Sequence, residues 1–152
     1  MARITSLFLT IGIVLGGCAG SFGSLSEAGR KAEEVKNIVP ENYKSDLLAF
    51  MRTYLNDPEN VRSAALSQPQ KIALGETDRY VACLRFNAKT GAGKYAGTKD
   101  SLAIFVSGKF DRLIELGRTG ANPDEAVRNK PLRDFCAAAS YQPFPELERL
   151  RR

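Results

Sequence analysis

The sequence contains no histidine and no tryptophan, and it has only three cysteines among 152 residues. The absence of histidine excludes the Ser-His-Asp and Cys-His constellations, a histidine general base and every histidine-ligated zinc or haem site. With 43% hydrophobic and 26% charged residues, the composition is that of a globular protein and argues against wholesale disorder. At this length one domain with its own hydrophobic core is the default expectation.

The N-terminal segment is organised like an export signal. Met1-Ala2-Arg3 carries one positive charge, and the stretch over 4–15 is apolar apart from four small or hydroxyl residues. Such a stretch is shorter than the ~20 residues that a membrane-spanning helix needs. The next run, Leu15-Gly16-Gly17-Cys18, resembles the lipobox of bacterial lipoproteins. The alternatives are an ordinary secretory peptide with an incidental cysteine, or a buried N-terminal helix.

The lipobox resemblance implies a lipid-anchored protein. It implies transfer of a diacylglyceryl group to the Cys18 thiol, cleavage after Gly17 and fatty acylation of the new amino terminus, and several acyl chains give stable anchoring. In Gram-negative lipoproteins, a residue other than Asp after the cysteine favours the outer membrane, and here that residue is Ala19. The resemblance therefore implies an outer-membrane lipoprotein that faces the periplasm.

The composition divides the full sequence into four segments. We predict a signal peptide over 1–17, a lipid anchor and tether over 18–42, a globular domain over 43–148 and a basic tail over 149–152. The charged stretch over 27–39 is either a spacer or a docking helix, because its apolar positions are few.

Two cysteines remain once Cys18 is lipidated. In an oxidising compartment Cys83 and Cys136 are expected to form one disulfide. The chain-entropy estimate for a bridge of this separation is ~4 kcal/mol of stability. Two buried free thiols are the alternative, and a redox-active pair is disfavoured by the lack of Cys-x-x-Cys spacing.

The hydrophobic pattern predicts an α+β fold. A broad apolar stripe predicts the main helix over 45–56, with Ser45 as its N-cap and Pro58 after its end. The candidate strands are 61–66, which also fits a short helix, 71–74, 79–89, 102–107 and 110–116. Gly108-Lys109 is the expected turn between the last two strands.

The predicted architecture is a small antiparallel sheet of three to four strands packed by this one main helix. A C-terminal helical segment over 132–139 would be tied back to the sheet by Cys136. We further expect a short helix over 124–128 and an extended segment over 141–147.

One part of the domain also carries a resemblance. Its motif residues are Val81, Cys83, Asn87, Ala88 and Lys89, followed by Gly93, Tyr95 and Gly97. Together with the helix that ends in Leu55-Asn56-Asp57-Pro58, the motif resembles small exported bacterial proteins of uncharacterised function, roughly over 45–110. The resemblance implies a small α+β domain and no established activity.

The loop after Asn87 is the main candidate for recognition. Gly91-Ala92-Gly93-Lys94 lacks the spacing of a phosphate-binding loop and leads into a strand, so its glycines fit a structural role. Exposed loops on rigid sheets often bind partners. The possible recognition residues are Asn87, Lys89, Lys94, Tyr95 and Lys99.

No pattern predicts catalysis, a metal site or a cofactor. Ser-x-x-Lys is missing, and the carboxylate pairs Glu33/Glu34 and Asp124/Glu125 lie in segments expected to be solvated, where nothing raises a pKa. The soft ligands are too few for a transition metal, and no Ca²⁺-binding loop motif occurs.

The charge balance bears on partners. The net charge of +5 becomes +4 when residues 1–17 are removed, because they hold Arg3 and no acidic residue. For an exported lipoprotein the expected partners are the membrane, another envelope protein, lipopolysaccharide or peptidoglycan, and not nucleic acid. We predict a non-catalytic structural or protein-binding role. The alternatives are an inhibitor or immunity-like lipoprotein acting against an envelope hydrolase, and an envelope hydrolase with a carboxylate pair.

Overall fold

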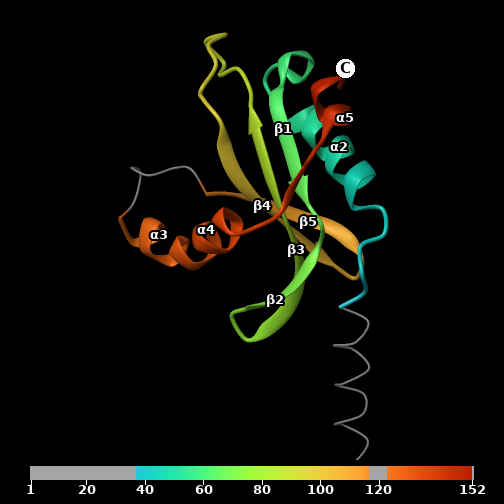
Figure 1. Cartoon of the computed structure of the whole chain (residues 1–152), viewed down its shortest axis with the longest axis vertical. Coiled ribbons are helices and arrows are strands. Elements are labelled where there is room, and N and C mark those ends of the chain that lie inside the picture. The colour runs from blue at the N-terminus through green and yellow to red at the C-terminus, as the bar shows by residue number, and fades with distance from the viewer. Residues whose placement is uncertain (1–36, 117–122, 152) are drawn as a thin grey trace, which may run out of the picture.

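The computed structural model describes residues 37–116 and 123–151 (Figure 1). Cys18, the predicted signal peptide and most of the predicted tether lie outside these residues. Within the described part of the chain, no helix has the length and hydropathy needed to cross a membrane. The elements are α2 (Tyr43–Tyr54), η1 (Pro58–Asn60), β1 (Arg62–Ser67), β2 (Gln70–Leu74), β3 (Thr77–Asn87), β4 (Lys99–Val106), β5 (Lys109–Glu115), α3 (Pro123–Arg128), α4 (Lys130–Ala137), β6 (Tyr141–Pro143) and α5 (Pro145–Glu148).

The α+β class is confirmed, but the sheet has six strands, so the prediction of three to four was too low. The strand order is β5-β4-β3-β1-β6, all neighbours are antiparallel, and β2 also pairs with β3. The long strand β3 pairs with β2 along its first half and with β1 along its second half. Pro69 lies between β1 and β2, and because proline has no amide hydrogen it interrupts what would otherwise be one strand. The three-residue strand β6 is too short to give a periodic signal, and it ends at Pro143 on the sheet edge, where proline is tolerated.

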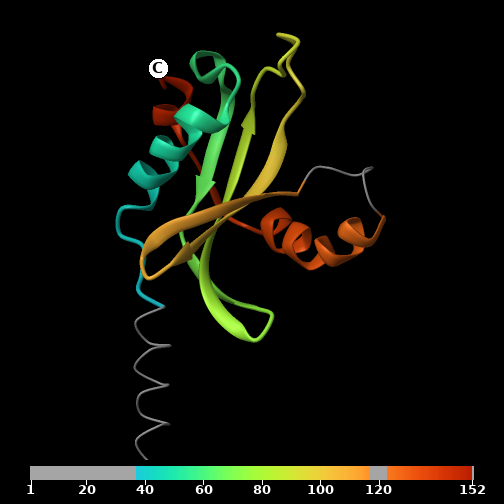
Figure 2. The same cartoon turned by 180° about the vertical axis from the view of Figure 1, so that it is seen from behind.

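The sheet has a hydrophobic core on each face. On β3, Leu84 and Phe86 belong to the core that α2 and α5 cover, whereas Val81 and Cys83 belong to the second core, together with Cys136 of α4. Figures 1 and 2 show α2 and α5 on one side of the sheet and α4 on the other. The pleat of β3 therefore sends alternate side chains into different cores.

The disulfide between Cys83 and Cys136 is present and confirms the predicted pairing. Its Cα atoms are 5.5 Å apart, and both residues are completely buried. The helix predicted over 132–139 is α4, and it carries Cys136 to the central strand. The short helix predicted over 124–128 is α3.

The main helix is present but lies two residues earlier than predicted, over 43–54 instead of 45–56. The predicted N-cap was wrong: Asn42 occupies that position, and the Ser45 hydroxyl lies within the first turn and donates to the carbonyl oxygen of Asn42 at 2.9 Å. Asn56 lies outside the helix, because the backbone is already extended at Leu55. Pro58 keeps Asp57 out of the α region, and Asp57 becomes the cap of η1.

Two further boundaries differ from the prediction. The β4–β5 turn is Ser107-Gly108, not Gly108-Lys109, and Lys109 already pairs with Val106. The stretch over 141–147 is extended only to Pro143, and helix α5 begins at Pro145, a residue that suits the first turn of a helix. Leu150, inside the predicted basic tail, is buried in the same core as Leu147.

Candidate functional site

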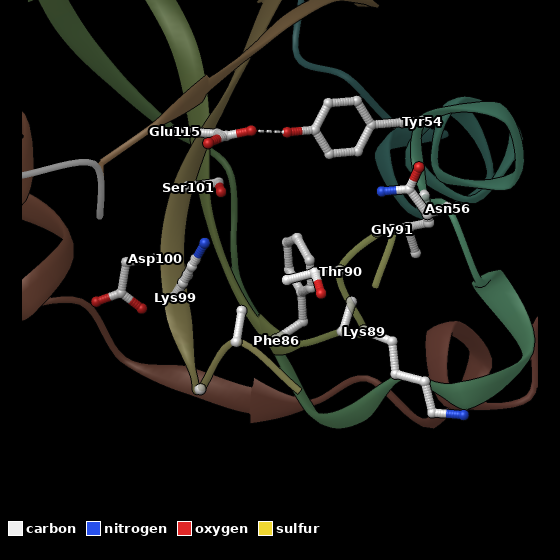
Figure 3. Close-up of a pocket in the computed structure, with 14 residues that line it drawn as sticks. Tyr54, Asn56, Phe86, Lys89, Thr90, Gly91, Lys99, Asp100, Ser101 and Glu115 are labelled. Atoms are coloured by element: carbon white, nitrogen blue, oxygen red, sulfur yellow. Dashed lines mark hydrogen bonds between the residues drawn. The ribbon is translucent and has the colours of Figure 1, made fainter. Parts of the chain in front are cut away.

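A cavity of about 270 Å³ lies where the C-terminal end of α2 meets the β3–β4 connection (Figure 3). We call residues 88–98 of this connection the hairpin loop. The residues that line the cavity come from the end of α2, the end of β3, the hairpin loop and the facing ends of β4 and β5. They are Tyr54, Leu55, Asn56, Phe86, Ala88, Lys89, Thr90, Gly91, Ala96, Gly97, Lys99, Asp100, Ser101 and Glu115.

The pleat of β4 determines which side chains face this cavity. Lys99 and Ser101 are two positions apart and share a face, whereas Asp100 points to the opposite face, as Figure 3 shows. Ser101 is only 1% exposed, and its partner across the β4–β5 pairing is Glu115. The wall of the cavity therefore carries an ammonium, a buried hydroxyl and a carboxylate on neighbouring positions of two strands.

Tyr54 connects the helix to this wall. Its hydroxyl donates a hydrogen bond to Oε1 of Glu115, which Figure 3 draws as a dashed line. The Tyr54 ring also stacks on Phe50, with ring centroids 5.0 Å apart. The ring contact and the hydrogen bond together fix the position of the Glu115 carboxylate.

Asp100 is held on the other face by Arg85. The guanidinium donates two hydrogen bonds to the carboxylate, at 2.6 and 2.9 Å, and it lies 4.2 Å from the ring centroid of Tyr141. The hydrogen bond with Asp100 raises the pKa of Arg85 above its ordinary value. Burial raises the pKa of Tyr141 to about 12, and the negative charge of Asp100 acts in the same direction.

The two carboxylates near the cavity therefore have separate partners. Asp100 is paired with Arg85, and Glu115 accepts from Tyr54. The carboxylate pair Asp124/Glu125 is exposed on α3, and Glu33/Glu34 lies outside the described residues. Among the residues that the structure describes, no cluster of three histidine, cysteine, aspartate or glutamate side chains is arranged to hold a metal ion.

The predicted recognition residues do not all converge. Lys89 and Lys99 line the cavity, although in Figure 3 the Lys89 ammonium points away from Glu115. It forms a salt bridge with Asp57 at 3.3 Å. The pKa of the Asp57 carboxyl is lowered, first by its hydrogen bond with Asn60 and then by Lys89. Lys89 therefore connects the hairpin loop to the start of η1 through this salt bridge, and it also lines the cavity.

Tyr95, Lys94 and Asn87 lie outside the cavity lining. Tyr95 forms a bridge with Lys89 and packs under the guanidinium of Arg62, 4.2 Å from its ring centroid. Lys94 is exposed in the loop. The Oδ1 atom of Asn87 is buried and has no hydrogen-bond partner in the described part of the chain.

Sequence reasoning missed Tyr54, Ser101, Glu115 and Arg62. Tyr54 and Glu115 are 61 positions apart, so no local motif could connect them. Only Ser101 could have been predicted from the sequence. It is two positions after Lys99, so in a strand the two side chains must lie on the same face.

A second cavity of about 440 Å³ lies between the start of β4 and helix α4. Lys99 and Asp100 contribute to both cavities, and Arg133 and Ala137 line the second one from α4. The start of β4 is therefore flanked by a hollow on each side.

Comparison with protein-family models, with curated proteins and with solved structures finds no match for this chain. Its function therefore has to be inferred from its own residues and geometry.

Proposed function

We propose that this chain is an outer-membrane lipoprotein of a Gram-negative envelope, with a non-catalytic role in binding another envelope component. The observation that carries the proposal is the fully buried disulfide between Cys83 and Cys136. Structural disulfides are typical of oxidising compartments such as the periplasm. This bridge uses both cysteines that remain after Cys18, so the cysteine count agrees with a lipid anchor preceding a periplasmic domain.

The surface proposed for binding is the end of the molecule that carries the hairpin loop. Figures 1 and 2 place the C-terminus at the same end, next to η1. We call this the basic end after its cations Arg62, Lys89, Lys94, Lys99, Arg149 and Arg151, with Tyr95 among them; Asp57, Glu59, Glu146 and Glu148 lie at the same end. Its exposed cations, such as Arg62 and Lys94, favour pairing with anionic groups of a partner, such as an acidic protein surface or the carboxylates of peptidoglycan.

The non-catalytic part of the proposal is supported by what the two lining carboxylates do. A carboxylate acid and base pair needs one member with a raised pKa and both aimed at one substrate position. Here Asp100 is bound to Arg85 on the opposite face of β4, so it does not share the wall of Glu115.

Metabolic labelling with a fatty acid tests the anchor. The wild-type chain is expected to incorporate label and to fractionate with outer membranes, and the Cys18→Ala variant is expected to do neither. Retention of label by Cys18→Ala would contradict the lipobox interpretation. Lys94→Ala, at the exposed loop, is the matched control and should be labelled normally.

Pull-down from membranes in mild detergent tests the binding role. The wild-type chain is expected to recover a consistent partner, and the double variant Arg62→Ala/Lys94→Ala is expected to recover less of it. Equal recovery by the two proteins would exclude the basic end as the binding surface. Consistent recovery of no partner would count against a binding role.

A second candidate function is an inhibitor or immunity-like lipoprotein acting against an envelope hydrolase. The observation that favours it is the shape of the hairpin loop, which projects beyond the neighbouring strands in Figure 1 and is exposed from Thr90 to Lys94. A projecting loop on a rigid sheet suits insertion into an enzyme cleft. A deletion strain with unchanged sensitivity to lysozyme and to competitor toxins would exclude this role.

A further inference from the structure

The cavity beside the hairpin loop places opposite charges on one wall. Lys99 and Glu115 lie on the same face of the β4–β5 pair, separated by the Ser101 position that pairs with Glu115. Figure 3 shows Lys99, Ser101 and Glu115 in a row, with Asp100 pointing the other way. A ligand in this cavity would therefore meet a cation, a hydroxyl and an anion in succession.

Lys99, the cationic member of this row, forms no salt bridge with a described carboxylate. Asp100 is adjacent in sequence, but it is engaged by Arg85 on the opposite face. Glu115 accepts a hydrogen bond from Tyr54, and a carboxylate has lone pairs for several donors. The wall thus presents the Lys99 ammonium to an anionic group, and it presents the carboxylate of Glu115, already hydrogen-bonded to Tyr54, as an additional acceptor for a cationic group.

The size and remaining lining of the cavity limit the ligand. Its volume of about 270 Å³ is slightly below the ~300–1,000 Å³ of pockets that hold drug-sized molecules. Phe86, which is 8% exposed, and Leu55 give the cavity an apolar part, whereas Thr90 and Asn56 add polar groups. These dimensions suit a group of about the size of one or two amino acids.

From this geometry we propose that the cavity binds a small zwitterion, namely a free α-amino acid. The ligand carboxylate is bound by the Lys99 ammonium, and its amino group donates to Glu115. The Ser101 hydroxyl hydrogen-bonds between them, and the ligand side chain packs on Phe86. This inference rests on the proposed binding role of the basic end and names the chemical class of its ligand.

Titration of the intact chain in detergent tests the proposal, with binding followed by isothermal calorimetry and by NMR shifts of the Gly91, Gly97 and Ser101 amides. The probes are glycine, D-alanine and a muropeptide with a free peptide terminus. Acetate and methylammonium serve as half-ligands that carry one charge each. The zwitterions are expected to bind at least about tenfold more tightly than either half-ligand, since each charge-assisted hydrogen bond contributes about that factor or more.

Variants locate the binding in the cavity. Lys99→Gln and Glu115→Gln nearly preserve side-chain length, and the amide oxygen that Glu115→Gln introduces can still accept from Tyr54. Both variants are therefore expected to fold and to weaken binding about tenfold or more. Ser101→Ala should weaken it by about three- to tenfold. Lys109→Gln, at an exposed lysine beside the β4–β5 turn and outside both the cavity lining and the basic end, is the matched control and should bind normally.

Tighter binding of D-alanine than of the muropeptide supports a site for free amino acids. Tighter binding of the muropeptide would overturn the zwitterion assignment, because the terminal unit of a peptide carries only one of the two charges. Absence of shifts with every probe, equal binding of the half-ligands, or unchanged binding by Lys99→Gln and Glu115→Gln would overturn the inference. Fatty-acid labelling at Cys18 is independent of these results, so the two proposals fail separately.

Discussion

Tyr141 lies at the centre of a small, partly buried polar group on the disulfide face of the sheet. Arg85 covers its ring and at the same time binds Asp100 through two hydrogen bonds. The Tyr141 hydroxyl is buried and has no hydrogen-bond partner in the described part of the chain. Because ionisation would place a second negative charge beside Asp100 in a poorly solvated position, the neutral phenol is strongly favoured.

This arrangement predicts a loss of stability at high pH. An unfolded tyrosine ionises near its ordinary pKa of 10.0, whereas Tyr141 in the folded protein ionises at about 12. Between these values the folded protein keeps a proton that the unfolded chain has lost. The free energy of unfolding should therefore fall as the pH rises from 10 towards 12.

The variant Tyr141→Phe is expected to flatten this pH dependence. Denaturant unfolding at pH 8, 10 and 11 measures the effect. In an absorbance titration at 295 nm, the variant should lack the tyrosine that ionises at the highest pH in the wild-type protein. At pH 8 the variant should lose less than ~1 kcal/mol, because the hydroxyl it removes makes no hydrogen bond to a described residue. An identical pH dependence in the two proteins would disprove the assignment.

The disulfide gives a second prediction about individual residues. The double variant Cys83→Ala/Cys136→Ala is expected to lower the free energy of unfolding by ~3–4 kcal/mol, since the open chain gains conformational freedom in the unfolded state. Urea unfolding of the two proteins measures the difference. Reductant should lower the stability of the wild-type chain and leave the double variant unchanged. Equal stability of oxidised and reduced wild-type protein would contradict the structural role of the bridge.

At the level of elements, the β4–β5 turn has an unusual backbone for its sequence. Ser107 and Gly108 have positive φ values of 52° and 73°, which is the pattern of a two-residue type I′ turn. Asparagine tolerates this conformation better than serine. Ser107→Asn is therefore expected to raise the free energy of unfolding by about 0.5–1 kcal/mol, as measured by urea unfolding.

Gly108 faces a tighter restriction. A Cβ atom at this position would lie 3.1 Å from Cγ2 of Ile38, in addition to the cost of positive φ. Gly75 has a similar φ of +64° and open space around it, so Gly75→Ala is the matched control. Thermal unfolding should show a loss of about 1–2 kcal/mol for Gly75→Ala, from the backbone alone, and a larger loss for Gly108→Ala. Equal losses would mean that Ile38 moves aside at no cost.

The elements also show how far sequence reasoning reaches. The strong alternation along β3 and the broad apolar stripe of α2 made these elements predictable, because each has enough residues to define a period. The strands β2 and β6 have five and three residues, so their pairing is decided by contacts with β3 and β1 and not by their own pattern. Helix α5 was missed for the same reason, since its four residues are held by burial of Leu147.

The cavity could be predicted only in part. The loop pattern led to Lys89 and Lys99, which do line it, because glycines and lysines between two strands mark an exposed connection. The opposite wall depends on Tyr54 and Glu115, which are brought together by packing of α2 across the sheet. A contact between residues 61 positions apart cannot be predicted from the pattern of a single sequence.

Considered as a whole, the described part of the molecule has two ends of different structure. Strand β3 runs from the β2–β3 turn to the hairpin loop and, at about 3.3 Å per residue, separates them by roughly 30 Å. Ile38, near the start of the described chain, contacts Gly108 in the β4–β5 turn, and that turn lies at the end of β4 opposite the hairpin loop. Figure 1 shows the same arrangement, with the chain entering the domain far from the basic end.

The arrangement of the two ends predicts where a partner is bound. Ile38, near the start of the described chain, lies beside the β4–β5 turn, so the basic end is at the opposite end of the domain from this entry point. A photo-crosslinking residue placed at Lys94 in living cells is therefore expected to capture a partner. The same residue at Glu76, an exposed position in the β2–β3 turn, is the matched control and is expected to capture none.

Mass spectrometry of the crosslinked product identifies what the basic end binds. An anionic partner is expected, because Arg62, Lys94 and the C-terminal arginines of the basic end are exposed cations that can pair with its acidic groups. Captured product should accordingly decrease when Arg62 is also replaced by alanine. Stronger crosslinking from Glu76 than from Lys94 would place the partner at the end where the described chain enters the domain and would reject the basic end as the binding surface.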